Sequence, residues 1–391
     1  MSIIPRNLVI ASKRILGDGN DRFQIWYKRH QEIVKFKDSR RIKIYESIQL
    51  TEEQKQAIDD LYMANYGSKI PYIWHRHYMA FTGNFDSRYF PELLYIPEFE
   101  RFCNLYPDFV TVFCDKNLLP YIAKSANVKM PQNLLSATRG FIKDYDNHPI
   151  SIERATEWLA TAGEVFVKPS INTGSGIGCA LLQMDKGVDQ LSGKTASEIL
   201  KALGKDFSIQ NRIVCSDDIQ KLHKESCNTF RVVTYRWKNA IKHMPIIMRI
   251  GRSNNHIDNA HAGGIFIGVN EDGRLNNTAF TEFNEKYTFH PDTKVVFENY
   301  RIQGVDRIIE SAITMHYMLP QLGVVNWDFT IDENNSPVLI EANTRGGGIW
   351  ILEMSHGVGP FGNYTEEVLR WMREMKKRKA SEREEIAFGN V

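Results

Sequence analysis

The sequence lacks a strong charge of either sign. Its 391 residues include 49 Lys and Arg against 47 Asp and Glu, a formal net charge of +2. Proteins that bind nucleic acids need a concentrated excess of basic residues to contact phosphates, so this balance argues against such a protein. Charged residues make up 25% and hydrophobic residues 42% of the chain, which are ordinary globular values. The length suggests about two or three domains.

Cysteines and long apolar runs are also scarce. The five cysteines are odd in number and none forms a C-x-x-C pair, which argues against a disulfide framework or a structural zinc site. No apolar run approaches the roughly 18 residues of a membrane span, and the first residues lack the apolar segment of a secretory signal. We therefore expect a cytoplasmic protein that binds small molecules.

A basic stretch precedes the first clearly bounded helix. Eight basic residues occur in it: Lys28, Arg29, His30, Lys35, Lys37, Arg40, Arg41 and Lys43. Such a cluster usually forms a solvated helix face, and docking to an acidic partner or to anionic lipid is the alternative. A helix follows, because Thr51 and Gln54 form a capping-box pattern and Gly67 suits a left-handed position at its end. Dense aromatics and prolines over residues 71–106 predict short helices in compact irregular structure.

After residue 115 the pattern indicates alternating short helices and strands. We expect helices over 151–162, from Thr195 (with Glu198 completing a capping box) to Gly204, and near 304–319 and 364–384. Strands are expected over residues 164–168, 207–214, 229–237, 241–250, 265–269, 324–331 and 338–342. Lys238-Asn239 fits a two-residue hairpin turn. This order of elements describes an α+β protein.

The first candidate site is the glycine-rich segment 168–178. A strand delivers Lys168 into a loop that contains Gly174, Gly176 and Gly178, and a second strand leaves the loop. Glycines let backbone N–H groups approach an anion closely, and the lysine supplies a positive charge. The order is not that of a P-loop, because the lysine precedes the glycines. A phosphate-binding flap and a plain flexible β-turn are both open at this point.

The second candidate site is a hairpin over residues 327–343. Glu341 and Asn343 are two residues apart on the returning strand, so their side chains share a face. If the strands pair across the turn, Asp328 can lie opposite them. Three oxygen ligands would then converge, as Mg²⁺ bridging nucleotide phosphates requires. A surface hairpin with polar residues on its wet face is the alternative.

Taken together, the two segments resemble the ATP-grasp superfamily, which includes D-alanine–D-alanine ligase and glutathione synthetase. The separations of 13 and 2 residues between Asp328, Glu341 and Asn343 match the metal-binding hairpin of that family. Further blocks resemble one branch, the sugar-transfer associated ATP-grasp proteins. They are residues 81–86, 115–117, 228–234, 249–252, 258–259 with 263–264, and 327–328. The resemblance extends from about residue 70 to residue 360.

The resemblance implies an ATP-grasp fold, in which two α+β subdomains clamp a nucleotide, preceded here by a mostly helical N-terminal region. Residues 1–110 would form this N-terminal helical and irregular region and serve substrate or partner docking. Residues 111–213 would form the small subdomain, with the phosphate flap and the hinge. Residues 214–391 would form the large subdomain, with the metal site and a C-terminal helix.

The resemblance also implies a nucleotide site. Lys116 and Lys168 would contact the phosphates, with Ser175 and Gly176 in the flap above them. The interdomain hinge, whose backbone reads adenine in the family, is matched by Gln210, Asn211, Arg212 and Ile213. A glutamate is common at Gln210, so here the adenine amino group would meet an amide oxygen.

Ribose and metal contacts follow from the same comparison. Asp217 falls where an acidic residue often takes the ribose hydroxyls, and Asp218 is its close rival. Asp328, Glu341 and Asn343 would hold Mg²⁺.

Three arginines are candidate catalytic groups. Arg231, Arg249 and Arg252 lie on or at the ends of expected strands, where arginines are usually solvated. A planar guanidinium also suits a γ-phosphate in transfer and an acyl-phosphate oxygen. We expect Arg231 and Arg249 to contact the transition state or the substrate, with Arg252 as a third candidate.

Two loops are candidates for contact with the second substrate. Arg345 precedes Gly346-Gly347-Gly348, where the family places such contacts, although the usual proline-glycine of that loop is missing here. Asp258-Asn259 and His261 form either a plain turn or a polar loop that lines the substrate cavity.

The function that the resemblance implies is an ATP-dependent ligase. It would use ATP and Mg²⁺ to convert a carboxylate into an acyl phosphate, which an amine or a thiol then attacks, releasing ADP and phosphate. Positioning and charge neutralisation carry most of the rate in such chemistry, which fits lysines, arginines and a metal without a catalytic triad. The carboxylate would belong to a small molecule or to a carrier or peptide. A kinase that phosphorylates a hydroxyl and a nucleotide-binding accessory protein without turnover are the alternatives.

Overall fold

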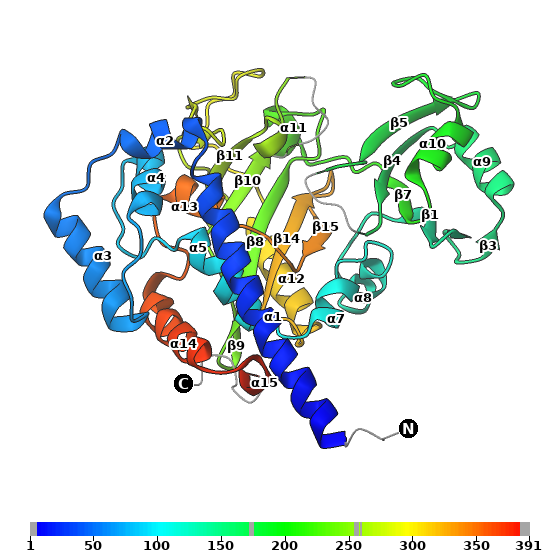
Figure 1. The fold of residues 1–391 in the computed structure, drawn as a ribbon. Coiled ribbons are helices and arrows are strands. Elements are labelled where there is room, and N and C mark those ends of the chain that lie inside the picture. Colours follow the sequence, from blue (N-terminus) through cyan, green and yellow to red (C-terminus); the bar gives the residue numbers. More distant parts are fainter. Residues whose placement is uncertain (1–5, 172–175, 254–257, 259, 384–391) are drawn as a thin grey trace.

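Two antiparallel sheets with helices around them make up the protein. The computed structural model describes residues 6–171, 176–253, 258 and 260–383. In Figure 1 the smaller sheet lies to the right with its own two helices, and the larger sheet occupies the centre. The architecture is the α+β arrangement that the sequence predicts.

The smaller sheet has seven strands in the order β3-β2-β1-β7-β4-β5-β6. Its strands are β1 (Asn133–Thr138), β2 (Phe141–Asp144), β3 (Pro149–Ile150), β4 (Glu164–Pro169), β5 (Ala180–Asp185), β6 (Val188–Asp189) and β7 (Phe207–Asn211). Helices α9 (Ile152–Ala160) and α10 (Ala196–Leu203) pack on it around a hydrophobic core of its own.

The larger sheet has eight strands in the order β13-β12-β11-β10-β8-β14-β15, with β9 paired to β8. Its strands are β8 (Thr229–Trp237), β9 (Ala240–His243), β10 (Ile246–Ile250), β11 (Ile265–Val269), β12 (Ala279–Phe280), β13 (Lys286–Tyr287), β14 (Val324–Ile331) and β15 (Pro337–Asn343).

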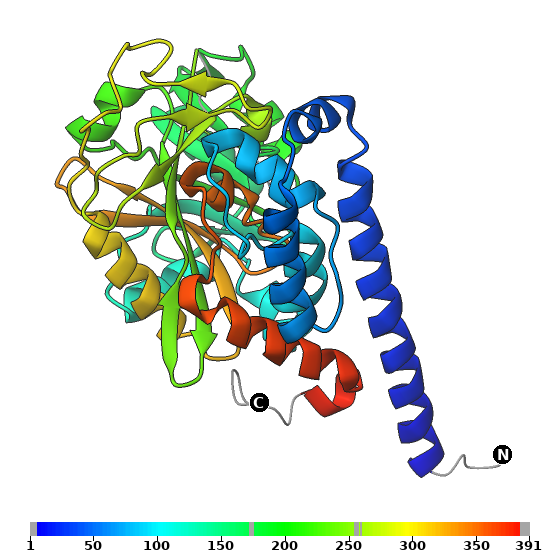
Figure 2. The same ribbon diagram turned by 90° about the vertical axis from the view of Figure 1, so that its left-hand side faces the viewer.

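Helices from both ends of the chain surround the larger sheet. The N-terminal ones are α1 (Arg6–Lys35), α2 (Ser39–Glu46), α3 (Glu52–Asn65), α4 (Ile73–Thr82), α5 (Glu92–Leu94), a π-helical turn η1 (Tyr95–Glu100), α6 (Arg101–Cys103), α7 (Pro107–Val112) and α8 (Leu119–Ser125). The later ones are α11 (Asp217–Leu222), the 3₁₀ turns η2 (Ala260–Ala262) and η3 (Gly362–Tyr364), α12 (Val305–Tyr317), α13 (Trp350–His356), α14 (Thr365–Lys377) and α15 (Ala380–Arg383). Figure 2 shows α1 along one side of the molecule, extending past the body.

Successive residues of β8 pack into different cores on the two faces of the larger sheet. Val232 belongs to a core shared with α7, α8, α11 and α12, whereas Val233 belongs to a core shared with helices from both chain ends. Side chains alternate along a strand, so Arg231 points to the same face as Val233. Helices α2 to α6 therefore cover the face of the sheet that carries the candidate arginine, whereas α7 and α8 pack on the opposite face.

Most of the expected elements are confirmed. Both capping boxes form, at Thr51 and at Thr195, and Lys238-Asn239 joins β8 to β9 as a two-residue turn. The single strand expected over 241–250 is wrong, because β9 ends at His243 and β10 begins at Ile246, on either side of Pro245. Proline has no N–H group to donate to a sheet. The strand expected over 207–214 ends at Asn211.

Within the described ranges, no helix combines the length and the apolar character that crossing a bilayer would require.

Phe36→Ala should lower the free energy of unfolding by about 3 kcal/mol or more, because it empties a buried aromatic position. The Phe36 ring lies 4.7 Å from the Trp74 ring and 5.1 Å from the His77 ring, centroid to centroid. Urea unfolding would measure the loss. Phe23→Ala, on the outer side of α1, is the matched control and should change stability by less than about 0.5 kcal/mol. Equal losses in the two variants would contradict the packing of the α1–α2 junction into the core.

Candidate functional site

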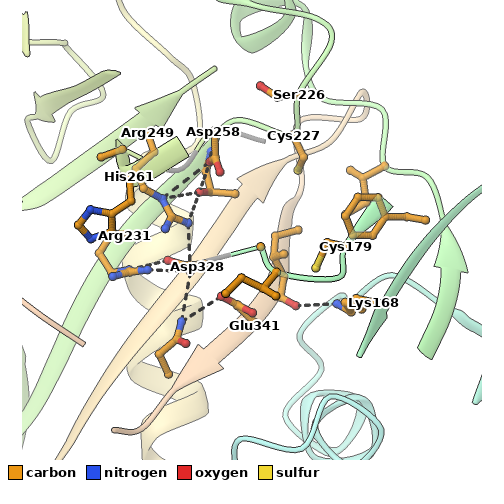
Figure 3. A pocket seen from close by; sticks show the side chains of 18 of the residues that line it. Lys168, Cys179, Ser226, Cys227, Arg231, Arg249, Asp258, His261, Asp328 and Glu341 are labelled. Carbon is orange, nitrogen blue, oxygen red and sulfur yellow. Dashed lines mark hydrogen bonds and ion pairs between the residues drawn. The ribbon is translucent and has the colours of Figure 1, made fainter. Parts of the chain in front are cut away.

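A cavity of about 430 Å³ lies between the two sheets. The smaller sheet contributes Phe166, Lys168 and Gln210 to its lining, and the larger sheet contributes Arg231 and Asp328. Figure 3 shows the charged side chains of both sheets pointing into this space.

The β14–β15 hairpin brings the three predicted metal ligands together. Asp328 is paired with Glu341 across the two strands, and the Asn343 Nδ2 donates to Asp328 Oδ2 at 3.3 Å and to Glu341 Oε1 at 3.2 Å. The register shifts by one residue between Asp328 and Phe329, which leaves Ile340 as an extra residue on β15. The carbonyl of Ile340 accepts a hydrogen bond from Lys168 Nζ at 3.4 Å.

Two arginines bind Asp328. Its register partner on β8 is Arg231, whose Nε and Nη2 donate to the two carboxylate oxygens at 2.6 and 2.9 Å. Arg249 of β10 adds an ion pair at 3.0 Å (Figure 3). Burial alone would raise the pKa of Asp328, but the charges of both arginines and their hydrogen bonds lower it to about 2. The two arginines therefore favour the ionised form of Asp328.

The donor set suits a hard divalent cation. Glu341 and Asn343 are partly exposed and line the cavity with a carboxylate and an amide. Such oxygens are what Mg²⁺ prefers, with phosphate and water in the other positions. The described part of the chain contains no group of three His, Cys, Asp or Glu side chains that could hold a metal alone.

Two lysines face the hairpin from the other side of the cavity. Lys116 Nζ lies 3.8 Å from Glu341 Oε2, and its backbone N–H donates to Ser170 O at 3.0 Å. Lys168 is buried, and burial lowers its pKa to about 8, with the Lys116 charge adding to the effect and Glu341 opposing it. A group whose charge costs this much in the protein gains most from an anion placed beside it.

The amino-acid sequence matches one protein family along most of its length. The family described as "Sugar-transfer associated ATP-grasp" matches residues 97–368, which is more than two thirds of the chain. The chain belongs to this family. Its α+β architecture is accordingly the ATP-grasp fold, as predicted.

Solved structures with a similar arrangement include three ligases. N5-carboxyaminoimidazole synthetase from Staphylococcus aureus, complexed with ADP, is 16% identical, with a TM-score of 0.36 over 60% of this chain and 46% of that one. The VanG D-Ala:D-Ser ligase from Enterococcus faecalis is 15% identical, with a TM-score of 0.39 over 68% and 63%. An L-amino acid ligase from Bacillus licheniformis is 13% identical, with a TM-score of 0.37 over 68% and 50%. The match thus spans less than two thirds of each of these chains. A comparison with curated proteins found no match.

Residues of the predicted flap and hinge also line the cavity. Gly176 lines it, whereas Ser175 lies outside the described residues. The predicted hinge residues Gln210, Asn211, Arg212 and Ile213 line it as well. The Gln210 Nε2 donates to Asn133 Oδ1 at 2.6 Å, so the amide oxygen of Gln210 is the atom left to meet a donor.

Two of the predicted site residues do not reach the cavity. Arg252 Nε donates to the carbonyl of Gly263 and its Nη1 to Tyr287 at 3.0 Å, which holds the guanidinium near β13. Asp217 is exposed in the first turn of α11, and its rival Asp218 lies 4.0 Å from Lys221. The cavity is instead lined near α11 by three residues without a recognisable sequence signal: Gln220, Lys224 and Glu225.

The polar loop interpretation of Asp258 and His261 agrees with their position, because both line the cavity, whereas Asn259 lies outside the described residues. Asp258 Oδ2 accepts from Thr229 N at 2.9 Å and lies 3.8 Å from Arg249 Nε. Burial raises the pKa of Asp258, against the charge of Arg249. Arg249 thus has a carboxylate on either side of it.

The glycine-rich loop after β15 is held by two buried glutamates of the N-terminal region. The carboxylate of Glu100 accepts from the N–H groups of Gly346 (2.8 and 2.9 Å) and Gly347 (3.3 Å). Glu92 Oε1 accepts from Ile349 N at 2.5 Å and Trp350 N at 2.8 Å. These contacts join residues about 250 positions apart, and nothing in the sequence indicates them. They fix the loop in which Arg345 lines the cavity.

Glu100→Gln should change how stability depends on pH. Burial raises the pKa of Glu100 from its ordinary value of 4.5 to about 7, although the hydrogen bonds from the amides of Gly346 and Gly347 oppose the shift. A carboxyl with a raised folded-state pKa stabilises the fold fully below the unfolded pKa and loses that contribution as pH rises toward 7. The wild type should therefore lose up to about 3 kcal/mol relative to the variant between pH 4.5 and 8.

Chemical unfolding of both proteins at several pH values measures this difference. Glu333→Gln, at an exposed turn position, is the control and should keep the wild-type profile. Parallel profiles for wild type and Glu100→Gln would show that Glu100 ionises normally in the fold.

Proposed function

We propose that the chain is an ATP-dependent ligase that joins a carboxylate to an amine through an acyl phosphate. One observation carries the proposal: two lysines, two arginines and three oxygen donors converge on a single cavity between two sheets. They are Lys116, Lys168, Arg231, Arg249, Asp328, Glu341 and Asn343. This set offers charge for phosphates and a metal, and no nucleophile is needed.

The nucleotide would lie across the cavity from the hinge to the hairpin. Beside the hinge, the lining is apolar, with Pro131, Phe166, Ile177 and Leu181, which suits the faces of an adenine ring. Lys116 and Lys168 lie at the other end, where the phosphates would neutralise the burial cost of their charges. The flap at Gly176 would cover them.

Mg²⁺ would be held by Glu341 and Asn343, with Asp328 beside them. When bound, it would offset the negative charge that the phosphates share during transfer. Asp328 already has its two oxygens on arginines, so its first task in this proposal is to orient Arg231 and Arg249. Each guanidinium has five N–H donors, and Asp328 uses only some of them.

The chemistry has two steps. A carboxylate oxygen of the substrate attacks the γ-phosphorus, the bond to the β-phosphate oxygen breaks, and ADP leaves. The amine nitrogen then attacks the acyl carbon, phosphate leaves, and the nitrogen loses a proton to give the amide. Arg231 and Arg249 would bind the equatorial oxygens of the transferred group. Arg345 and His261, which line the cavity, would contact the acceptor.

The test is a screen for ADP release with pooled carboxylates and pooled amines, followed by mass spectrometry. A product with the summed mass minus water supports the ligase. ADP release with a stable phosphoester and no amide would identify a kinase instead. Tight ATP binding without turnover on any pool would favour an accessory protein.

Glu341→Gln should reduce ATP turnover by at least about 100-fold and leave the melting temperature nearly unchanged, because it removes the exposed anionic ligand. Steady-state ADP release over a range of Mg²⁺ concentrations would measure the effect. Asp328→Ala is a poorer test, since it would leave two arginines without their counter-charge.

Two matched controls lie away from the cavity lining. Glu333→Gln, in the turn of the same hairpin, and Arg252→Ala, bonded near β13, should both retain wild-type turnover. Wild-type turnover in Glu341→Gln at every Mg²⁺ concentration would reject the metal assignment.

A further inference from the structure

Charged side chains of helix α1 contact the rest of the protein. Asp21 accepts from Arg101 at 2.6 Å and from Arg383 at 2.7 Å, and Arg29 pairs with Glu98 at 2.5 Å. Asp21 and Glu32 are both buried. The inner face of this helix is a single stripe with the spacing 21, 25, 29 and 32, in which charged residues flank Ile25, a side chain that packs against the hydrophobic core.

The outer face of α1 is aromatic and aliphatic. We call it the α1 aromatic face and define it as Phe23, Trp26, Tyr27, His30, Ile33 and Val34. These positions follow the spacing i, i+3, i+4, i+7, so they form one stripe opposite the ion pairs. Phe23 and Trp26 are 54% and 60% exposed, and their rings lie 5.9 Å apart. The Trp26 ring stacks on His30 at 5.8 Å.

This arrangement reverses the usual polarity of a surface helix. Single exposed aromatic side chains are ordinary on a protein surface. A continuous stripe of exposed aromatic and aliphatic side chains along one helix instead indicates a surface that binds another molecule or a membrane. Figure 2 shows α1 at the side of the molecule, so an extended flat partner can reach it.

The net charge of the N-terminal segment favours an anionic partner. Residues 6–46 contain eleven Lys and Arg against five Asp and Glu, whereas the rest of the chain has 38 against 42. Among the described side chains of residues 17–37, the exposed charged ones are Arg22, Lys35 and Lys37, while the acidic Asp21 and Glu32 are buried, with Glu32 paired to Lys35. A second copy of α1 would bring like charges together. An anionic surface would complement them.

We propose that the α1 aromatic face docks on an anionic lipid bilayer, with the helix lying in the headgroup region. Aromatic side chains favour this interface, and nearby basic residues add attraction to anionic lipid. Lys35, at the end of the same helix, lines the cavity, so docking would bring the cavity close to the membrane surface. The proposal does not depend on the ligase chemistry.

The experiment is co-sedimentation of the full chain with phosphatidylcholine vesicles. One set also contains roughly 30 mol% phosphatidylglycerol, which gives the surface a strong negative charge. We expect binding to the anionic vesicles and little binding to the neutral ones. In roughly 0.5 M salt, where charges are screened over a length on the order of 4 Å, the affinity for anionic vesicles should fall by at least about tenfold. Phe23→Ser with Trp26→Ser should weaken binding by at least about tenfold at an unchanged melting temperature.

The matched control is Tyr145→Ser with Tyr317→Ser, which removes two aromatic side chains that are each 58% exposed elsewhere. This variant should bind as the wild type does. Absence of binding to the anionic vesicles, or equal binding by the α1 variant, would overturn the proposal. A wild-type dimer in solution that the α1 variant converts to a monomer would assign the face to a second copy and would also overturn it.

Discussion

The buried carboxylate of Asp328 constrains the whole site. A buried charge must be compensated, and here two arginines from neighbouring strands supply the compensation. That requirement ties together the register of β8, β10 and β14, since Arg231 lies directly opposite Asp328. The bulge beside Asp328 leaves the Ile340 carbonyl as the acceptor for Lys168. The two halves of the cavity thus meet at one hairpin.

The N-terminal region helps to hold the site in place. It shares a hydrophobic core with α13, α14 and the larger sheet, and two of its glutamates hold the backbone of the glycine-rich loop. The donors are backbone N–H groups of the loop, which a change of side chain does not remove. They donate to carboxylates whose burial costs free energy. Glu92 precedes the segment 97–368 that matches the family, whereas Glu100 lies within it, so the loop is supported from both sides of that boundary.

Basic side chains of the N-terminal region are also compensated by carboxylates. Four members of its basic cluster, Arg29, Lys35, Arg40 and Arg41, are ion-paired with acidic residues of the protein. Of these pairs, Arg29–Glu98 joins α1 to the rest of the protein and Lys35–Glu32 lies within α1, while the aromatic stripe of α1 stays exposed. The solvated-face interpretation of the cluster therefore accounts for only part of it.

The sequence alone determined the elements with local signals. Capping boxes, the hairpin turn and the extents of β8 and β14 depend on neighbours within a few residues, and the Asp328–Glu341–Asn343 spacing depends on two adjacent strands. Only the tertiary structure decided that Arg231 and Arg249 bind Asp328, that Arg252 and Asp217 lie elsewhere, and that Glu92 and Glu100 support the loop. Those contacts join residues about 80 to 250 positions apart, where pairing follows from how sheets and helices pack and leaves no periodic trace in the chain.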